Sequence, residues 1–387
     1  MTSVVGRLKG LVRGPSSIRI GVIASLVGPL DYYGTMQTRG LELGIEYATR
    51  GSDSVAGRPI ELLIEDDAGD PATGGQKARA LIEDQQVDIL QGCSSSAVTI
   101  VVARVAQEYG RLLLVEPAAA DSITGTHFNR TIFRTAASVS QDAAAGGRYA
   151  VEHLGRTFCF IAPDYVWGRQ STAAWQRVIE EHGGETLGEF LAPPDTRDFT
   201  PYLQAILELK PDVLVQSWAG GGYRYLFSNM RSIGIFDHMH VTGGLGDREA
   251  RHALGLDAVG MVGIIKYSHV LPDNPVNDWL VEKHNERYGE NPDLFTGGGF
   301  AAGIALVEAL RRTRGEPDTE ALIEAMEGMW FQGPKGIYTF RPEDHQALQS
   351  MYVVEMVPDP NPDHSWAIPR LIKEMSAKET APPLLIA

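Results

Sequence analysis

The chain has 387 residues, 43% of them hydrophobic and 21% charged, a composition typical of a soluble globular protein. A formal net charge of -15 gives an acidic surface that repels phosphate backbones and so disfavours general nucleic-acid binding. No apolar run approaches the roughly 18 residues of a membrane-spanning helix, so we do not expect an integral membrane protein. The length exceeds what one hydrophobic core supports, which predicts two lobes.

Residues 1–17 are predicted to be an N-terminal extension. This segment carries basic residues but lacks the continuous apolar run of a secretory signal. Two possibilities follow. Either the protein is cytoplasmic, or it is exported and its signal is missing from these 387 residues.

From residue 18 onward, short β-rich runs alternate with amphipathic stretches, which is typical of a parallel sheet with crossover helices. Strands are expected at 18–24, 60–66, 87–90 and 112–115. Helices are expected near 35–50, 71–85 and 97–109. This series ends at 131–134 and predicts one open α/β lobe.

The alternation then begins again, which predicts a second lobe that resembles the first. Its strands are expected at 157–162, 186–191, 213–216 and 240–242. Its helices are expected near 140–154, 169–183, 199–209 and 221–232. Another apolar run at 261–265 closes this series.

The last third of the chain contains more predicted helices and strands than the second lobe alone can accommodate. Helical stretches lie near 275–288, 299–313 and 318–327, and β-rich runs at 337–340, 351–357 and 367–372. We infer crossings between the lobes near 135, 264 and 340. The first lobe is then 18–135 plus 265–340, the second is 136–264 plus 341–372, and 373–387 is a loosely packed C-terminal tail.

Loops at the carboxyl ends of the strands are where open α/β sheets bind ligands. One of them is the serine turn, Ser94, Ser95 and Ser96, between a predicted strand and a predicted helix. Serine hydroxyls, free N–H groups and the helix dipole suit an anion such as a carboxylate, although an ordinary capped helix also explains the serines. Other loops carry aromatic residues, including Tyr33, Trp167 and Trp218, which favours an apolar or aromatic ligand with one polar head.

Motifs for catalysis or metal binding do not assemble. The acidic cluster at 65–70 lacks EF-hand spacing, and the histidines lack zinc-ligand spacing. Glycines at 297–299 and 303 lack dinucleotide-binding spacing, so we interpret them as close helix packing. We predict that the protein is not an enzyme and uses no metal or cofactor.

The ordered motifs resemble the leucine/isoleucine/valine-binding protein family, class I periplasmic solute-binding proteins of ABC importers. The residues that carry the resemblance are 18–23 with Gly28 and Pro29, then 65–71, 93–96, 116–120 and 133–135. The resemblance covers about residues 18–357. It implies an α/β fold of two Rossmann-like lobes joined by three crossovers, with a ligand cleft between the lobes that closes about a hinge.

Carried over by position, the resemblance implies that Ser94 binds the ligand carboxylate, with Ser95 and Ser96 beside it. Tyr33 and Trp167 would cover the ligand from opposite lobes. The backbone around Ala118 and Ala119 would also face the ligand.

Two positions depart from the family pattern. The threonine that binds the ammonium in α-amino-acid members is Ala120 here, and the acidic partner falls near Leu245. Asp247 or Glu249 would restore an acceptor if that loop aligns differently. Because a buried ammonium without acceptors is costly, these departures disfavour an amino acid as ligand.

Two further positions differ in their predicted partners. Glu116 stands where the family has serine, and we expect it to bind either a ligand group or Arg134. The family also pairs the Cys93 position in a disulfide, but its partner position is Gly69 here, which implies a free thiol.

The predicted function is an extracytoplasmic solute-binding subunit that presents a small organic carboxylate to an ABC permease. The ligand is expected to be an aromatic or branched aliphatic acid, with an amino acid still possible. A monomer is expected. The alternative is a cytoplasmic ligand sensor on the same fold, similar to amide-responsive regulators.

Overall fold

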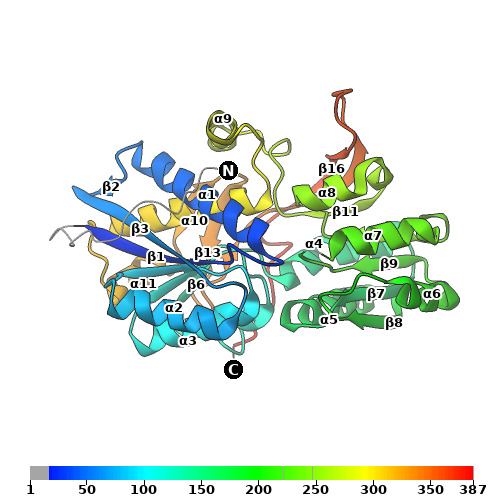
Figure 1. Cartoon of the computed structure of the whole chain (residues 1–387), viewed down its shortest axis with the longest axis horizontal. Coiled ribbons are helices and arrows are strands. Elements are labelled where there is room, and N and C mark those ends of the chain that lie inside the picture. The colour runs from blue at the N-terminus through cyan, green and yellow to red at the C-terminus, as the bar shows by residue number, and fades with distance from the viewer. Residues whose placement is uncertain (1–16, 221, 246, 387) are drawn as a thin grey trace.

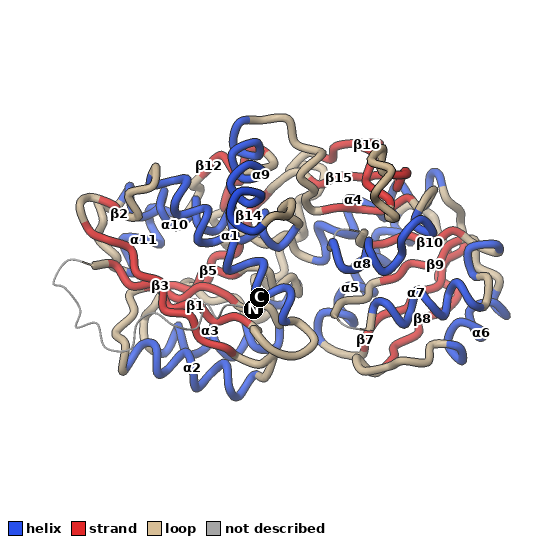
Figure 2. The backbone as a smooth tube through the Cα atoms, turned by 45° about the horizontal axis from the view of Figure 1, so that its top comes forward, coloured by secondary structure: helices blue, strands red, loops and turns tan. Residues whose placement is uncertain are grey.

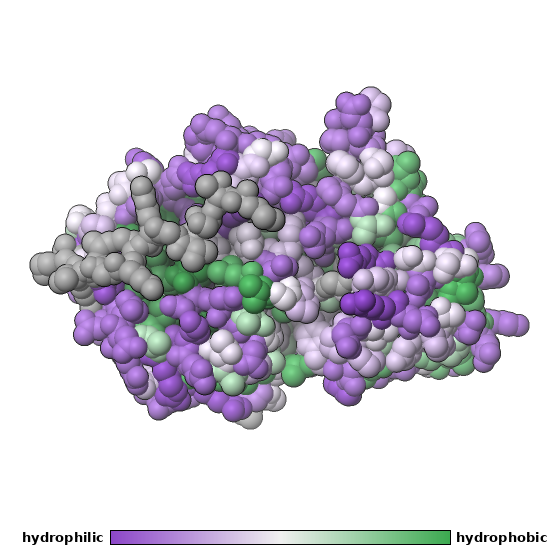
Figure 3. Space-filling model, viewed as in Figure 1, coloured by the Kyte–Doolittle hydropathy of each residue, from purple (hydrophilic) through white to green (hydrophobic). Residues whose placement is uncertain are grey.

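The computed structural model describes residues 17–220, 222–245 and 247–386, which form two α/β lobes side by side (Figure 1). Of the predicted N-terminal extension, residues 1–16 lie outside the described residues. The polypeptide alternates between strands and helices in both lobes, as the sequence predicted. The face in Figure 3 is mostly hydrophilic, in keeping with the acidic composition.

The first lobe is built on a six-stranded sheet in the order β2-β3-β1-β4-β5-β6. Its strands are β1 (Ile18–Ala24), β2 (Ser54–Val55), β3 (Arg58–Asp66), β4 (Ile89–Gly92), β5 (Leu112–Val115) and β6 (Ile132–Arg134). All neighbours pair in parallel except β2 and β3. β1 is buried along its whole length, as expected of a central strand that is covered on both faces.

Helices cover both faces of this sheet, with α2 and α3 on one side and α1 and α10 on the other (Figures 1 and 2). The helices of the first lobe are α1 (Asp31–Thr49), α2 (Pro71–Glu83), α3 (Ser96–Glu108), α9 (Pro275–Tyr288), α10 (Leu294–Arg312) and α11 (Thr319–Met326), with a short 3-10 helix at Asp121–Ile123. A small sheet of β12 (Trp330–Gly333), β13 (Gly336–Phe340) and β14 (Ala347–Leu348) completes the lobe.

The second lobe contains a parallel sheet in the order β10-β9-β7-β8. Its strands are β7 (Thr157–Pro163), β8 (Glu185–Ala192), β9 (Val213–Gln216) and β10 (His240–Gly243). Its helices are α4 (Val139–His153), α5 (Val166–Glu181), α6 (Thr200–Leu209), α7 (Tyr223–Ser232) and α8 (Arg248–Leu254), with 3-10 helices at Ile235–Asp237 and Gly255–Ala258. An antiparallel sheet joins β11 (Val262–Ile265), β15 (Met351–Pro358) and β16 (Ala367–Met375).

The predicted boundaries need two corrections. β14 pairs with β13, so residues 341–348 stay with the first lobe and the third crossing lies near 349 instead of 340. β16 continues to Met375, into the predicted tail. The tail is also less loose than expected, because Thr380 is fully buried and its hydroxyl donates to the carbonyl of Gln349 at 3.1 Å.

Helix α10 begins at Leu294, five residues before the predicted start, because the glycines at 297–299 lie inside the helix. By length and composition α10 passes the test for a membrane-spanning helix, but 78% of its apolar window is buried in the protein, as in a core helix. The interpretation of the glycines as helix packing is confirmed. A Cβ on Gly299 would lie 2.0 Å from the carbonyl oxygen of Gln37 in α1.

Candidate ligand-binding cleft

A cavity of about 940 Å3, its open mouth included, lies between the two lobes. It is bordered by loops that follow the strands of both main sheets, by the first turns of α1 and α10, and by the crossover after β11. The volume falls in the range of small-molecule sites. Eight of the ten predicted ligand contacts line it, namely Tyr33, Ser94, Ser95, Ser96, Ala118, Ala119, Trp167 and Trp218.

The serine turn follows β4 and leads into α3. Ser95 is the N-cap residue, but its side chain makes no capping hydrogen bond to any described residue. The hydroxyl oxygen of Ser96 accepts from the N–H of Ala120 at 3.3 Å, and that of Ser94 lies 3.5 Å from the N–H of Ser25. The capped-helix explanation of the serines is therefore wrong. Their hydroxyl donors stand at the positive end of α3, where an anion is favoured.

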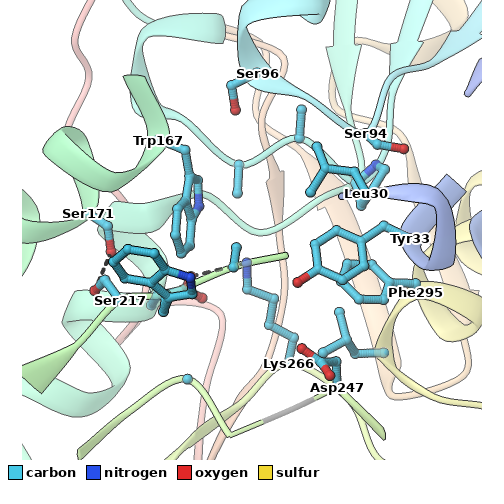
Figure 4. A pocket seen from close by; sticks show the side chains of 18 of the residues that line it. Leu30, Tyr33, Ser94, Ser96, Trp167, Ser171, Ser217, Asp247, Lys266 and Phe295 are labelled. Atoms are coloured by element: carbon cyan, nitrogen blue, oxygen red, sulfur yellow. Dashed lines mark hydrogen bonds and ion pairs between the residues drawn. The ribbon is translucent and has the colours of Figure 1, made fainter. Parts of the chain in front are cut away.

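Aromatic side chains form the walls of the cavity (Figure 4). Tyr33, in the first turn of α1, stacks on Phe295 in the first turn of α10, with ring centroids 3.9 Å apart. Trp167 stands across the cavity from this pair, in the first turn of α5. Trp218 is only 4% exposed and packs edge-on against Phe199, so its ring belongs mainly to the core of the second lobe.

Charged residues lie on the floor of the cavity, and of these the sequence predicted only Asp247, as an alternative acceptor. Lys266, just after β11, pairs with Asp142 of α4 at 3.0 Å, and both line the cavity. Asp247, the N-cap of α8, also lines it and accepts from the N–H of Ala250 at 2.6 Å. No sequence motif marks Asp142, which lies in the first turn of α4, or Lys266, which lies in the crossover after β11.

The two remaining predicted contacts, Ala120 and Leu245, do not line the cavity, which corrects the prediction. Ala120 is fully buried, and its carbonyl accepts from Arg134. Leu245 is 2% exposed and packs into the apolar core of the second lobe. Asp247, two residues further along, lines the cavity together with Gly244 of the same loop, as the alternative alignment allowed.

Glu116 lies behind the cleft and does not line it. Its predicted partner Arg134 makes hydrogen bonds to Ala120, Thr124 and Gln346 instead. The hydroxyl of Thr135 donates to Glu116 at 3.0 Å, and burial raises the pKa of Glu116 to about 7. Cys93 is free and buried, as predicted, and burial raises the pKa of its thiol.

Polar contacts join the two lobes. The hydroxyl oxygen of Tyr33 accepts from the N–H of Gly220 at 2.8 Å. Arg248 pairs with Glu290 at 2.6 Å, and Gln170 accepts from the N–H of Ser122 at 3.0 Å. Glu290 and Ser122 belong to the first lobe, and Arg248 and Gln170 belong to the second. These contacts hold the two lobes together.

Asp247 makes the stability of the protein depend on pH. Burial raises the pKa of its carboxyl from an ordinary value of 3.8 to about 7. Between these values the folded state keeps a proton that the unfolded state has lost, so this contribution to stability is present below pH 4 and is lost as the pH rises to 7. Replacing Asp247 with asparagine, which also caps helices, is expected to raise the free energy of unfolding at pH 8 by about 1–3 kcal/mol and to leave it unchanged at pH 3.5.

Urea unfolding of both proteins at the two pH values measures this difference. Asp318→Asn is the matched control, because Asp318 caps α11 in the same way but is exposed. The control is expected to change stability by less than about 0.5 kcal/mol at either pH. An equal effect of Asp247→Asn at pH 3.5 and pH 8 would contradict the assignment.

Comparison with known proteins agrees with this architecture. The sequence profile of the periplasmic binding proteins matches residues 17–361. Leu/Ile/Val-binding protein homolog 6 from Brucella abortus is 24% identical over 349 residues, which cover 88% of this chain and 87% of that protein. An ABC-type branched-chain amino acid transporter protein from Rhodopseudomonas palustris is 36% identical, with a TM-score of 0.84, and the match covers 96% of this chain and 100% of that one.

A second Rhodopseudomonas palustris structure shares the fold. It is a solute-binding protein of an ABC transporter in complex with 3,4-dihydroxybenzoic acid. Identity is 24% and the TM-score is 0.84, with 93% of this chain and 98% of that chain covered. The prediction of a class I periplasmic-binding-protein fold is confirmed by these likenesses.

Proposed function

We propose, from the premise that this chain belongs to the periplasmic binding protein family, that it is an extracytoplasmic subunit of an ABC importer and traps a small organic carboxylate. The observation that carries the proposal is the cleft itself, where the serine turn and the walls formed by Tyr33 and Trp167 meet between the lobes. This role requires no chemical reaction, because the protein only has to bind the ligand and close around it.

The serine turn supports a carboxylate at one end of the ligand. Hydroxyl groups of Ser94 and Ser95 and the N-terminus of α3 offer donors without a cation. The aromatic walls support an apolar or aromatic body for the rest of the ligand. The related Rhodopseudomonas palustris protein whose structure contains 3,4-dihydroxybenzoic acid has a ligand of this class.

Closure of the lobes supports the transport role. A ligand that touches the serine turn in the first lobe and Trp167 in the second gains contacts only when the lobes meet, so it favours the closed state. The contacts of Tyr33 with Gly220 and of Arg248 with Glu290 then stabilise the closed state further. The closed, loaded protein is the form that we propose an ABC permease receives.

A thermal-shift screen of aromatic acids, branched aliphatic acids, amides and amino acids tests the proposal. A ligand that binds only the native state must raise the apparent stability, by about 2.7 kcal/mol at a hundred times its Kd. We expect the largest shifts from aromatic or branched acids. No shift from any acid would contradict the proposal, and shifts from leucine-like amino acids alone would point to Asp247 as an ammonium acceptor.

Ser94→Ala tests the carboxylate end. The variant is expected to weaken the binding of 4-hydroxybenzoate by about 1–3 kcal/mol, because a hydrogen bond to a charged group is lost. Isothermal titration calorimetry measures the change. Ser232→Ala, at the exposed end of α7, is the matched control and should bind like the wild type. An unchanged affinity in Ser94→Ala removes this residue from the site.

A further inference from the structure

A second cavity, which we call the hinge chamber, lies behind the ligand-binding cleft. It is not sealed, and its volume of about 420 Å3 includes open space at its edge. Residues of all three crossovers between the lobes line it, namely 135–137, Lys266, Tyr267 and Gln349. Lys266 and Phe295 line both the chamber and the cleft. The chamber therefore adjoins the cleft at the hinge.

Lys335 lines the hinge chamber and has no carboxylate partner. It lies in the turn between β12 and β13 and is 5% exposed. Its Nζ atom donates to the carbonyl of Lys266 at 2.8 Å, and its contacts with the sulfur of Met351 at 3.8 Å and the ring centroid of Tyr338 at 5.8 Å are weak. Within the part of the chain that the structure describes, no Asp or Glu forms an ion pair with it. Because a buried ammonium without a counter-ion is costly, this environment favours the neutral amine.

The charged groups around Lys335 act in both directions. Burial and the positive charge of Lys266 lower the pKa of its amine, while the carboxylates of Asp142, Glu116 and Glu374 raise it. The lowering is larger, and the pKa of Lys335 falls from 10.5 to about 7. An ordinary lysine is neutral at pH 7 to only roughly one part in 3000. A desolvated amine beside a second cation is instead available as a nucleophile.

Glu116 brings an acid or base to the same chamber. Its Oε2 atom accepts from the hydroxyl of Thr135 at 3.0 Å. Its Oε1 atom has no partner among the described residues, yet it is not one of the polar atoms sealed inside the protein. Gly298 leaves room for this oxygen, because a Cβ there would lie 2.2 Å from it. With a pKa of about 7, the carboxyl of Glu116 can give or take a proton near neutral pH.

We propose that Lys335 is a reactive lysine that captures small aldehydes or ketones in the hinge chamber as an imine. The Nζ lone pair attacks the carbonyl carbon to form a C–N bond, and a proton moves from nitrogen to oxygen to give a carbinolamine. Glu116 then protonates the hydroxyl group, and the C–O bond breaks as the C=N bond forms. The carboxylate takes the remaining proton from the nitrogen. The carbonyl oxygen thus leaves as water, and neither an oxidant nor a reductant is consumed.

Reductive trapping with acetaldehyde and cyanoborohydride tests the proposal in the wild-type protein, independently of any ligand in the cleft. Cyanoborohydride reduces the imine to a stable ethyl-lysine, which peptide mass spectrometry locates. At pH 7 we expect Lys335 to be labelled about tenfold or more faster than Lys378, an exposed lysine that serves as the control within the same molecule. The difference should disappear in concentrated urea, where the chamber no longer exists. Labelling of Lys335 no faster than that of Lys378 in the folded protein overturns the proposal.

The pH profile and one variant identify the reacting amine. The labelling rate at Lys335 should stop rising above about pH 8, because its amine is by then largely neutral. Lys335→Met keeps an unbranched side chain and should lose the fast-labelled site. A fast-labelled lysine that persists in this variant overturns the assignment. If circular dichroism shows that the variant does not fold, the wild-type profile decides, since a rate at Lys335 that still rises beyond pH 9 contradicts the proposal.

Discussion

Gly40→Ala is expected to lower the free energy of unfolding by about 3 kcal/mol or more, because α1 and α10 touch backbone to backbone at this residue. A Cβ on Gly40 would lie 2.1 Å from the carbonyl oxygen of Thr296 and 2.8 Å from the amide nitrogen of Phe300. Neither atom is the end of a flexible side chain, so the helices must separate. Urea unfolding followed by tryptophan fluorescence measures the loss.

The same substitution at Gly244 is the matched control. A Cβ there would meet no described atom within 4 Å, and Gly244 does not have a left-handed backbone. Gly244→Ala is expected to change stability by less than about 1 kcal/mol. A wild-type unfolding midpoint for Gly40→Ala would contradict the role of the glycine contact.

The helix contact also positions one wall of the cleft. Tyr33 stands in the first turn of α1 and Phe295 in the first turn of α10, and their rings stack. Moving the helices apart shifts one ring relative to the other. The surviving folded fraction of Gly40→Ala should therefore also bind 4-hydroxybenzoate more weakly than the wild type.

Long elements could be predicted from the sequence because their hydrophobic period is a local property. The parallel strands of both main sheets and most helices fall within a few residues of their predicted bounds. β14 has two residues and α8 has seven, too few to show a period, so neither was predicted. β14 is defined by its pairing with β13, and missing it placed the third crossing too early.

The site could be predicted where it consists of loops that follow strands, which accounts for the serine turn, Ala118 and Ala119, and Trp167. Phe295, Asp142 and Lys266 were not predicted as contacts because they are far in sequence from the loops beside which they lie, and only the folded chain brings them together. The prediction of Leu245 as a ligand contact was wrong because the loop aligns two residues further along. Leu245 therefore lies in the core, and Asp247 lines the cavity. Sequence periodicity carries no information about such a shift.

Trp167→Ala is expected to have the largest effect on binding. The side chain forms the wall of the cavity contributed by the second lobe, opposite Tyr33 (Figure 4). Its removal loses the apolar contact with the ligand and opens the cavity to water. Central tryptophans of this kind cost about 2–4 kcal/mol when truncated, so the Kd for 4-hydroxybenzoate should rise roughly 30- to 1000-fold.

Trp330→Ala separates this effect from the general loss of a tryptophan. Trp330 is 59% exposed on β12 in the first lobe, outside the cleft lining, and its removal should leave both affinity and stability close to wild type. Trp167→Ala should weaken binding far more than it lowers the unfolding midpoint of the unliganded protein, because the side chain is only partly buried without a ligand. Retained affinity in Trp167→Ala would mean that the closed second lobe gains no binding energy from a contact between Trp167 and the ligand. That result would contradict the proposed trapping mechanism at this wall of the cavity.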